Sequence, residues 1–138
     1  MTQSSCTTTI HVPADAIWQV ISDFGAACQY ITMVVNCTVE GEGVGALRTL
    51  TSADGTTILE RLDAVDVAAR RLSYTLLTDT PFGDCLTTMS VRALGSHLSE
   101  LAWSASFQPD GLPASEAVAL LEGALEANCL ALKQLLER

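Results

Sequence analysis

The sequence predicts an α+β fold in which a curved antiparallel sheet of seven strands wraps around a long C-terminal helix. Three observations support this fold class. Six short β-rich runs follow one another between residues 34 and 107 with only short turns between them, which favours antiparallel hairpins. An alternating strand and a helical segment precede these runs, and a long helix with one apolar face follows them. We expect that face to cover the sheet.

The N-terminal part combines one strand with two short helices. Residues Cys6–Val12 alternate with period two and are rich in β-branched side chains, which predicts a strand. Pro13 suits a first helical position, and Asp15 lies in the first turn of the helix that follows. We expect this helix to end near Gly25, and a second short helix or turn to cover residues 26–31. The apolar face of the first helix has helical spacing and comprises Ile17, Val20, Ile21 and Phe24.

The remaining elements are the other strands and the C-terminal helix. Asp54-Gly55 is a strong two-residue hairpin signal between two of the runs. The six predicted strands are Val34–Glu40, Ala46–Ser52, Thr56–Asp66, Arg71–Leu77, Cys85–Ala93 and His97–Phe107. A turn at Pro109-Asp110-Gly111 then leads into the long helix, whose apolar face comprises Val118, Leu121, Leu125, Leu132 and Leu135. Seven strands around a helix need not close tightly, and the gap is a natural ligand site.

Composition limits the function classes. A chain of 138 residues is expected to form a single domain over residues 1–138. Seven basic against sixteen acidic side chains give a net charge of −9, which argues against partners such as nucleic acid or an anionic membrane surface. The chain has neither a secretory signal nor a run long enough for membrane insertion, so we expect a cytoplasmic protein. A homodimer is left open.

Two further compositional features concern the interior. Hydrophobic residues make up 49% of the chain but aromatic residues only 5%, which suits a packed aliphatic core and a lined cavity equally well. The five cysteines are widely spaced, without a C-x-x-C motif, and are expected to be free thiols. We therefore expect neither a metal site nor a cofactor. The cysteines are Cys6, Cys28, Cys37, Cys85 and Cys129.

Several short motifs, in order along almost the whole chain, carry a family resemblance. They are Pro13–Trp18 with Asp23-Phe24, Gly43–Thr49, Asp54-Gly55, Glu60–Asp63 with Asp66, Leu72–Tyr74 and Trp103–Phe107. Together they resemble the START-like (SRPBCC) superfamily and its polyketide cyclase/dehydrase branch, which is similar to plant abscisic-acid receptors and birch-pollen-allergen-like proteins. The resemblance implies the helix-grip fold and an internal hydrophobic pocket with a few polar groups.

Glu60 and Arg48 are the sharpest site candidates. Period two puts Glu60 on the more apolar face of its strand, beside Ile58 and Leu62, so we expect an inward carboxylate rather than a solvated one at the sheet edge. The resemblance implies the same position. A two-residue turn at Asp54-Gly55 would place Thr49 opposite Glu60 and Arg48 one step away. We therefore predict an Arg48–Glu60 ion pair at the pocket mouth, with a surface arginine as the open alternative.

Six other residues complete the predicted site. Asn128 interrupts the apolar helix face formed by Leu121 and Leu125, and needs a water, ligand or backbone partner. Tyr74 and Trp103 lie among apolar neighbours on their strands and are candidate pocket walls, although such residues are often ordinary core. Cys85 shares an inward face with Thr87 and Met89. The resemblance implies tyrosine where this chain has Cys85, and therefore a larger or less polar pocket.

Two functions remain after these observations. The favoured one is non-enzymatic binding of a small hydrophobic or amphipathic molecule, with Glu60, Arg48 and Asn128 as polar anchors. The alternative is an enzyme of the polyketide cyclase/dehydrase type, in which Glu60 is the general base and Arg48 or Tyr74 stabilises an enolate oxygen. The resemblance supports either function, because one fold hosts both.

Overall fold

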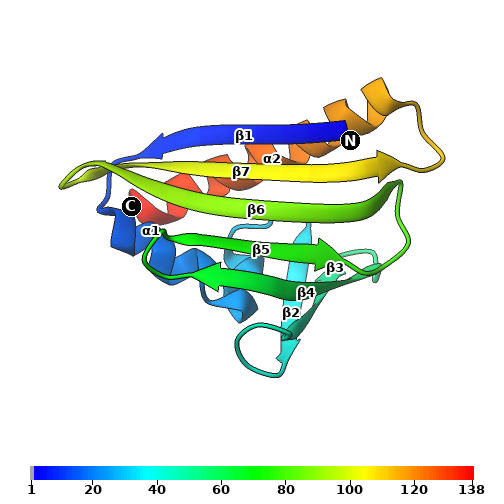
Figure 1. The fold of residues 1–138 in the computed structure, drawn as a ribbon, viewed down its shortest axis with the longest axis horizontal. Coiled ribbons are helices and arrows are strands. Elements are labelled where there is room, and N and C mark those ends of the chain that lie inside the picture. The colour runs from blue at the N-terminus through cyan, green and yellow to red at the C-terminus, as the bar shows by residue number, and fades with distance from the viewer. Residues whose placement is uncertain (1) are drawn as a thin grey trace.

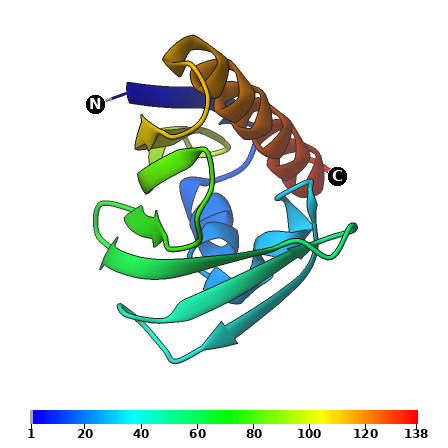
Figure 2. The same ribbon diagram turned by 90° about the vertical axis from the view of Figure 1, so that its right-hand side faces the viewer.

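All seven strands form one antiparallel sheet, and the helices pack against its concave face (Figure 1). The fold comes from a computed structural model, which describes residues 2–138. The strand order is β1-β7-β6-β5-β4-β3-β2. Seen from the side, the sheet curls so that β2, β3 and β4 turn underneath the helices while α2 crosses the opposite end (Figure 2). The predicted fold class, a seven-stranded antiparallel sheet with a long C-terminal helix, is confirmed.

The elements follow the predicted order. They are β1 (Thr2–Ile10), α1 (Ala14–Ile21), the 3-10 helix η1 (Phe24–Gln29), β2 (Val34–Glu40), β3 (Leu47–Ser52), β4 (Thr57–Asp66), β5 (Arg71–Leu76), β6 (Phe82–Gly95), β7 (Leu98–Pro109) and α2 (Ala114–Leu136). Within the described residues, no helix is long and apolar enough to cross a membrane.

Boundaries in the N-terminal part differ from the prediction. Strand β1 begins at Thr2 because its whole length pairs with β7, from Thr2 opposite Phe107 to Ile10 opposite Ser99. Helix α1 ends at Ile21 rather than near Gly25. The Asp23 carboxylate accepts a hydrogen bond from the Gly25 N–H and caps the start of η1, so the predicted second short helix begins at Phe24, two residues earlier than expected.

The β3–β4 hairpin has a three-residue loop, not the predicted two-residue turn. The Gly55 N–H bonds to the Ser52 carbonyl, and Gly55 has φ +87°, a left-handed conformation that suits glycine. The extra residue shifts the register by one, so the predicted pairing of Thr49 with Glu60 is wrong. Arg48 lies directly opposite Glu60 instead. Directly opposed residues share a face of the sheet, so the longer loop brings the two side chains together.

A register shift between β4 and β5 bends the sheet. Leu62 pairs with Tyr74, but Ala64 pairs with Ser73, which leaves Asp63 as the extra residue. Upstream of the shift, Leu62 is buried as the alternation predicts, whereas Ala64 is exposed. The bulge therefore makes Leu62 the last inward-facing residue of β4.

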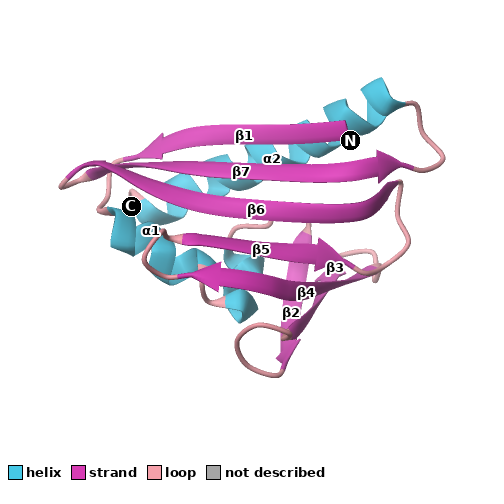
Figure 3. Cartoon of the chain, in the orientation of Figure 1, coloured by secondary structure: helices cyan, strands magenta, loops and turns pink. Residues whose placement is uncertain are grey.

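Helix α2 crosses the concave face beside β1 and β7 (Figure 3). Near its start, the Ser4 hydroxyl donates to the Val118 carbonyl at 3.0 Å, and near its end the Lys133 ammonium donates to the Thr9 carbonyl at 2.7 Å. Leu125 and Leu132 on the predicted apolar face are buried between these two contacts. Burying each leucine is worth roughly 1.5–3 kcal/mol, so apolar packing of this face contributes strongly to holding α2 on the sheet.

The core divides into two hydrophobic clusters. The larger one surrounds α1 and includes Ile17, Trp103 and Leu132. The smaller one lies toward the start of α2 and includes Phe107 and Ala117. Leu121 on α2 packs against both clusters, and the site described below lies beside it.

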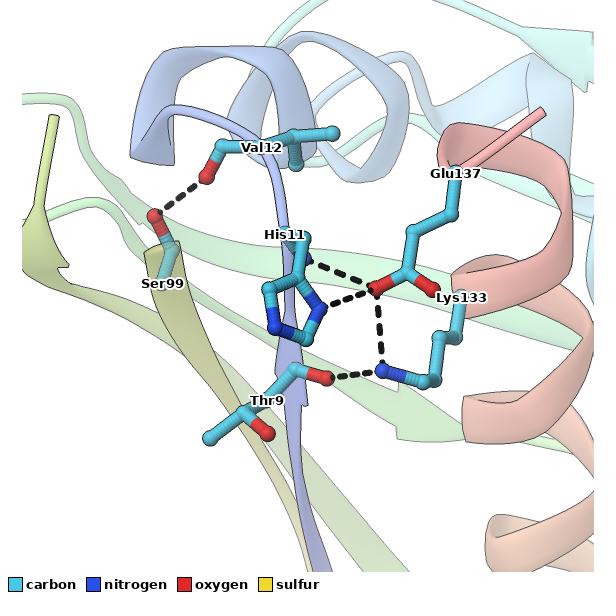
Figure 4. A network of polar contacts seen from close by, with 6 residues as sticks. All are labelled: Thr9, His11, Val12, Ser99, Lys133 and Glu137. Atoms are coloured by element: carbon cyan, nitrogen blue, oxygen red, sulfur yellow. Dashed lines mark hydrogen bonds and ion pairs between the residues drawn. The ribbon is translucent and has the colours of Figure 1, made fainter. Parts of the chain in front are cut away.

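The C-terminal end of α2 is held by a polar network (Figure 4). One oxygen of Glu137 accepts hydrogen bonds from the His11 backbone N–H at 2.8 Å and from Lys133 at 2.9 Å, and it lies 3.0 Å from the His11 ring. Ser99 bonds to the Val12 carbonyl in the same region. The hydrogen bonds to Glu137, first the one from the His11 backbone N–H and then those from Lys133 and the His11 ring, lower the pKa of Glu137 to about 2.

The depressed pKa predicts how stability depends on pH. The stabilising contribution of the Glu137 carboxylate is fully present above its ordinary pKa of 4.5 and is lost as the pH falls toward 2, because the unfolded chain takes up the proton first. In urea unfolding, Glu137→Gln should therefore destabilise the protein at pH 6, and the difference from wild type should shrink between pH 4.5 and 2. Glu126→Gln, an exposed change on the same helix, is the control. Identical pH profiles for the two variants would contradict the prediction.

Candidate ligand cavity and its buried ion pair

A cavity of about 320 Å³ lies between the sheet and α2, next to both hydrophobic clusters. This volume is at the lower end of the ~300–1,000 Å³ typical of small-molecule sites. The residues around it come from β2 to β7, α2 and the loops before β2 and β6. Its apolar walls include Ile31, Met33, Val34, Leu50, Ile58, Leu76, Pro81, Phe82, Ala105 and Ala124.

The cavity reaches the surface beside two loops. Met33, in the loop between η1 and β2, lines the cavity although it is 68% exposed. Pro81, just before β6, is exposed and also lines it. Phe82 beside it is partly buried, and its ring packs edge-on against Phe107 at 5.3 Å between centroids. Phe82 thus forms a fixed wall near the opening.

Seven of the eight predicted site residues line this cavity. They are Glu60, Tyr74, Cys85, Trp103, Leu121, Leu125 and Asn128. Arg48 is the exception: it is 1% exposed and lies outside the cavity wall. The prediction that the ion pair forms is correct, but Arg48 neither lines a pocket mouth nor lies on the surface. The side chain turns inward beneath η1 instead.

The Arg48–Glu60 pair forms the polar centre of the site. Nε of Arg48 donates to Oε1 of Glu60 at 2.8 Å, and Nη2 lies 2.7 Å from the same oxygen without a well-aligned hydrogen bond. Nη1 donates to the Phe24 carbonyl at 3.3 Å. The two side chains are 2% and 12% exposed, respectively. At this depth an uncompensated charge would cost several kcal/mol, so each group depends on the other.

Two aromatic rings enclose the guanidinium. Its central carbon lies 4.0 Å from the centroid of the Phe24 ring and 4.6 Å from that of Tyr74. Such cation–π contacts are worth about 2 kcal/mol when desolvated. Phe24 comes from η1 and Tyr74 from β5, so Arg48 connects the helical layer with the middle of the sheet. Burial alone would lower the pKa of Arg48, but the nearby Glu60, Tyr74 and Tyr30 raise it above its ordinary value.

Glu60 combines burial with a compensating charge. Burial raises the pKa of its carboxyl group, and Arg48 limits this rise. Arginine stays protonated in proteins, so a neutral Glu60 would leave a buried guanidinium without a counter-charge. Glu60 is therefore a carboxylate at neutral pH.

Two buried tyrosines lie near the pair. Trp103 Nε1 donates to the hydroxyl of Tyr74 at 3.2 Å, and the Tyr30 ring packs edge-on against Trp103 at 5.9 Å between centroids. The Tyr30 hydroxyl is buried without a well-aligned partner among residues 2–138. Burial raises the pKa of both phenols, so both are neutral. Tyr74 and Trp103 thus form an aromatic part of the cavity wall, with Tyr30 packed against Trp103.

Asn128 supplies a polar group on α2. Its side-chain oxygen accepts hydrogen bonds from the Thr32 N–H at 3.0 Å and from the Thr32 hydroxyl at 3.3 Å. Of the alternatives that the sequence leaves open, a backbone partner is the one present. These bonds tie α2 to the loop before β2. Because the oxygen is engaged, the amide nitrogen is the atom left for a molecule in the cavity.

Sequence reasoning missed the residues in irregular segments. Ile31, Met33 and Pro81 lie in loops, where no regular period indicates a direction. Cys85 was identified from its strand and lies in the wall, and burial raises the pKa of its thiol, which favours the unreactive protonated form. In the described part of the chain, no group of three or more His, Cys, Asp or Glu side chains could hold a metal ion.

The sequence matches the family described as "Polyketide cyclase / dehydrase and lipid transport" over residues 1–137. The chain belongs to this family. A search of curated proteins found no match. The family includes lipid-transport and cyclase members, so membership by itself selects neither activity.

Solved structures share the fold over nearly the whole chain. The protein XoxI from Bacillus cereus is 25% identical with a TM-score of 0.90, covering 99% of this chain and 96% of its own. A Thermobifida fusca protein is 25% identical with a TM-score of 0.83, covering 96% and 91%. The Zhui aromatase/cyclase from Streptomyces sp. R1128 is 22% identical with a TM-score of 0.76, covering 96% and 88%, and supports the fold alone.

The buried pair predicts strong coupling in a double-mutant cycle. Arg48→Met or Glu60→Leu alone should cost about 3–5 kcal/mol in the free energy of unfolding, because each leaves one buried charge unpaired. The double variant should cost much less than the sum. The exposed Arg92–Glu100 pair, with nitrogen and oxygen 3.2 Å apart, is the control and should couple by less than about 1 kcal/mol. Additive costs at positions 48 and 60 would contradict the geometry.

Proposed function

We propose that this protein binds a small hydrophobic or amphipathic molecule in the cavity between the sheet and α2. The observation that carries the proposal is an apolar cavity with a carboxylate from Glu60 in one wall and an amide from Asn128 in another. An apolar lining with a small number of convergent polar groups is typical of a small-molecule site. Membership of a family that includes lipid transport supports the same function.

The physical basis is the apolar lining. An apolar ligand that leaves water for such a cavity gains roughly 25 cal/mol for each Å² of surface buried. Glu60 and Asn128 would then orient the ligand rather than supply most of the affinity. The wall is largely preformed, since Trp103, Tyr74 and Phe82 are held by contacts with other protein groups.

Filling the cavity with a larger side chain should weaken binding of an apolar probe. N-phenyl-1-naphthylamine, an uncharged probe that fluoresces more strongly in apolar surroundings, should bind the wild-type protein with saturation. Ala124 lines the cavity, and Ala124→Phe should weaken binding of the probe at least tenfold by occupying its space. Ala127 is exposed on the same helix, so Ala127→Phe is the matched control and should bind as wild type does. Equal binding by the two variants would place the probe elsewhere and contradict the proposal.

The cyclase/dehydrase alternative rests on the raised pKa of Glu60 in the cavity wall, which suits a general base. Arg48 is buried and does not line the cavity, so the role of stabilising an enolate oxygen would fall to Tyr74 or the Asn128 amide. Turnover of a poly-β-keto thioester that is lost in Glu60→Gln, while N-phenyl-1-naphthylamine still binds, would favour the enzyme. Release of an unmodified ligand in mass spectrometry would favour binding alone.

A further inference from the structure

The charge distribution around the cavity is one-sided. Glu60 is the only charged residue among the described residues that line it. Its partner Arg48 is 1% exposed and does not belong to the wall. A molecule in the cavity therefore meets the carboxylate of the pair and not its guanidinium.

The two oxygens of Glu60 are used differently. Oε1 takes both contacts from Arg48, at 2.8 Å to Nε and 2.7 Å to Nη2. Among residues 2–138, no protein group forms a hydrogen bond with Oε2, yet this atom is not fully buried. Since Glu60 lines the cavity, Oε2 is available to accept a hydrogen bond from a ligand.

The pair also restricts the charge of the ligand. Arg48 and Glu60 together are neutral, so an added anion or cation would leave a net charge in a space of low polarity. An anion would in addition be repelled by the carboxylate, and none of the described residues in the wall is a cation that could offset the repulsion. An uncharged hydroxyl or N–H group avoids both costs and forms a charge-assisted hydrogen bond.

We propose that the cavity selects uncharged apolar ligands that carry a hydrogen-bond donor, such as a hydroxyl group, directed at Oε2 of Glu60. Carboxylates such as fatty-acid anions are excluded. Ammonium compounds are excluded as well, because Arg48 already neutralises Glu60 and a second cation would leave an uncompensated charge in the cavity. This inference rests on the proposed function, because it specifies the chemistry of a ligand in the same cavity.

Four naphthalenes that differ in one substituent test the proposal by calorimetric titration at pH 7. They are 2-naphthol (a neutral donor), 2-methoxynaphthalene (no donor), 2-naphthoate (an anion) and 2-naphthylmethylammonium (a cation). We expect 2-naphthol to bind about tenfold more tightly than 2-methoxynaphthalene, as a hydrogen bond to a charged acceptor predicts. Both ions should bind at least tenfold more weakly than 2-naphthol. Equal binding of 2-naphthol and 2-naphthoate would overturn the proposal.

The negative charge of the whole protein could also weaken binding of the anion. Raising NaCl from 0.15 M to 1 M shortens the screening length from about 8 Å to about 3 Å and suppresses this contribution. The disadvantage of 2-naphthoate should persist at 1 M NaCl, because Glu60 acts at contact distance within the cavity. If the disadvantage disappears with salt, the selectivity belongs to the surface charge of −9 and the inference is wrong.

Glu60→Gln tests the residue itself. The change removes the counter-charge of Arg48, so an anionic ligand can take its place, and 2-naphthoate should gain at least tenfold relative to 2-naphthol. An unchanged preference in a folded variant would contradict the proposal, and if the variant does not fold, the wild-type series decides alone. Ala124→Phe separates the two hypotheses. If Ala124→Phe weakens binding of none of the naphthalenes, the proposed function fails. If it weakens binding of all four and the wild-type protein binds all four equally well, only this inference fails.

Discussion

Burial of the Arg48 guanidinium constrains much of the surrounding structure. A cation that is 1% exposed must be compensated on every side, and the compensating groups come from different parts of the chain. Glu60 from β4 supplies the counter-charge, while η1 supplies the Phe24 ring and carbonyl. Tyr74 from β5 covers the other side. These contacts tie η1, which packs against β2 and β3, to the ion pair and, through Tyr74, to β5.

The cavity arises where packing around this pair stops. One cluster fills the space near α1 and another lies at the start of α2, and the cavity wall contains small side chains, namely Cys85 and Ala105 from the second cluster and Ala124 from α2. Larger residues at these positions would fill the gap. The low aromatic content of the chain, 5%, is thus consistent with a lined cavity as well as an aliphatic core. The curvature of the sheet, increased by the bulge at Asp63, completes the enclosure.

Family membership leaves the chemistry open, because the same fold serves lipid transport and cyclisation. The distinguishing feature here is the order of the charges: the carboxylate of Glu60 faces the cavity and the guanidinium lies behind it. Arg48 therefore keeps Glu60 ionised, and only the carboxylate of the pair faces the cavity. A cavity lined in this way differs chemically from one with an arginine in the wall, even when the two backbones superimpose.

The sequence by itself determined the order of elements, the inward faces of the strands and the α2 face, because period-two and helical spacing are local properties of the chain. Those faces placed Glu60, Tyr74, Trp103 and Asn128 toward the interior correctly. Only the tertiary structure decided that Arg48 lies behind the wall. That outcome depends on one extra loop residue in the β3–β4 hairpin and on η1 covering the guanidinium, and contacts between distant segments leave no periodic signal in the sequence.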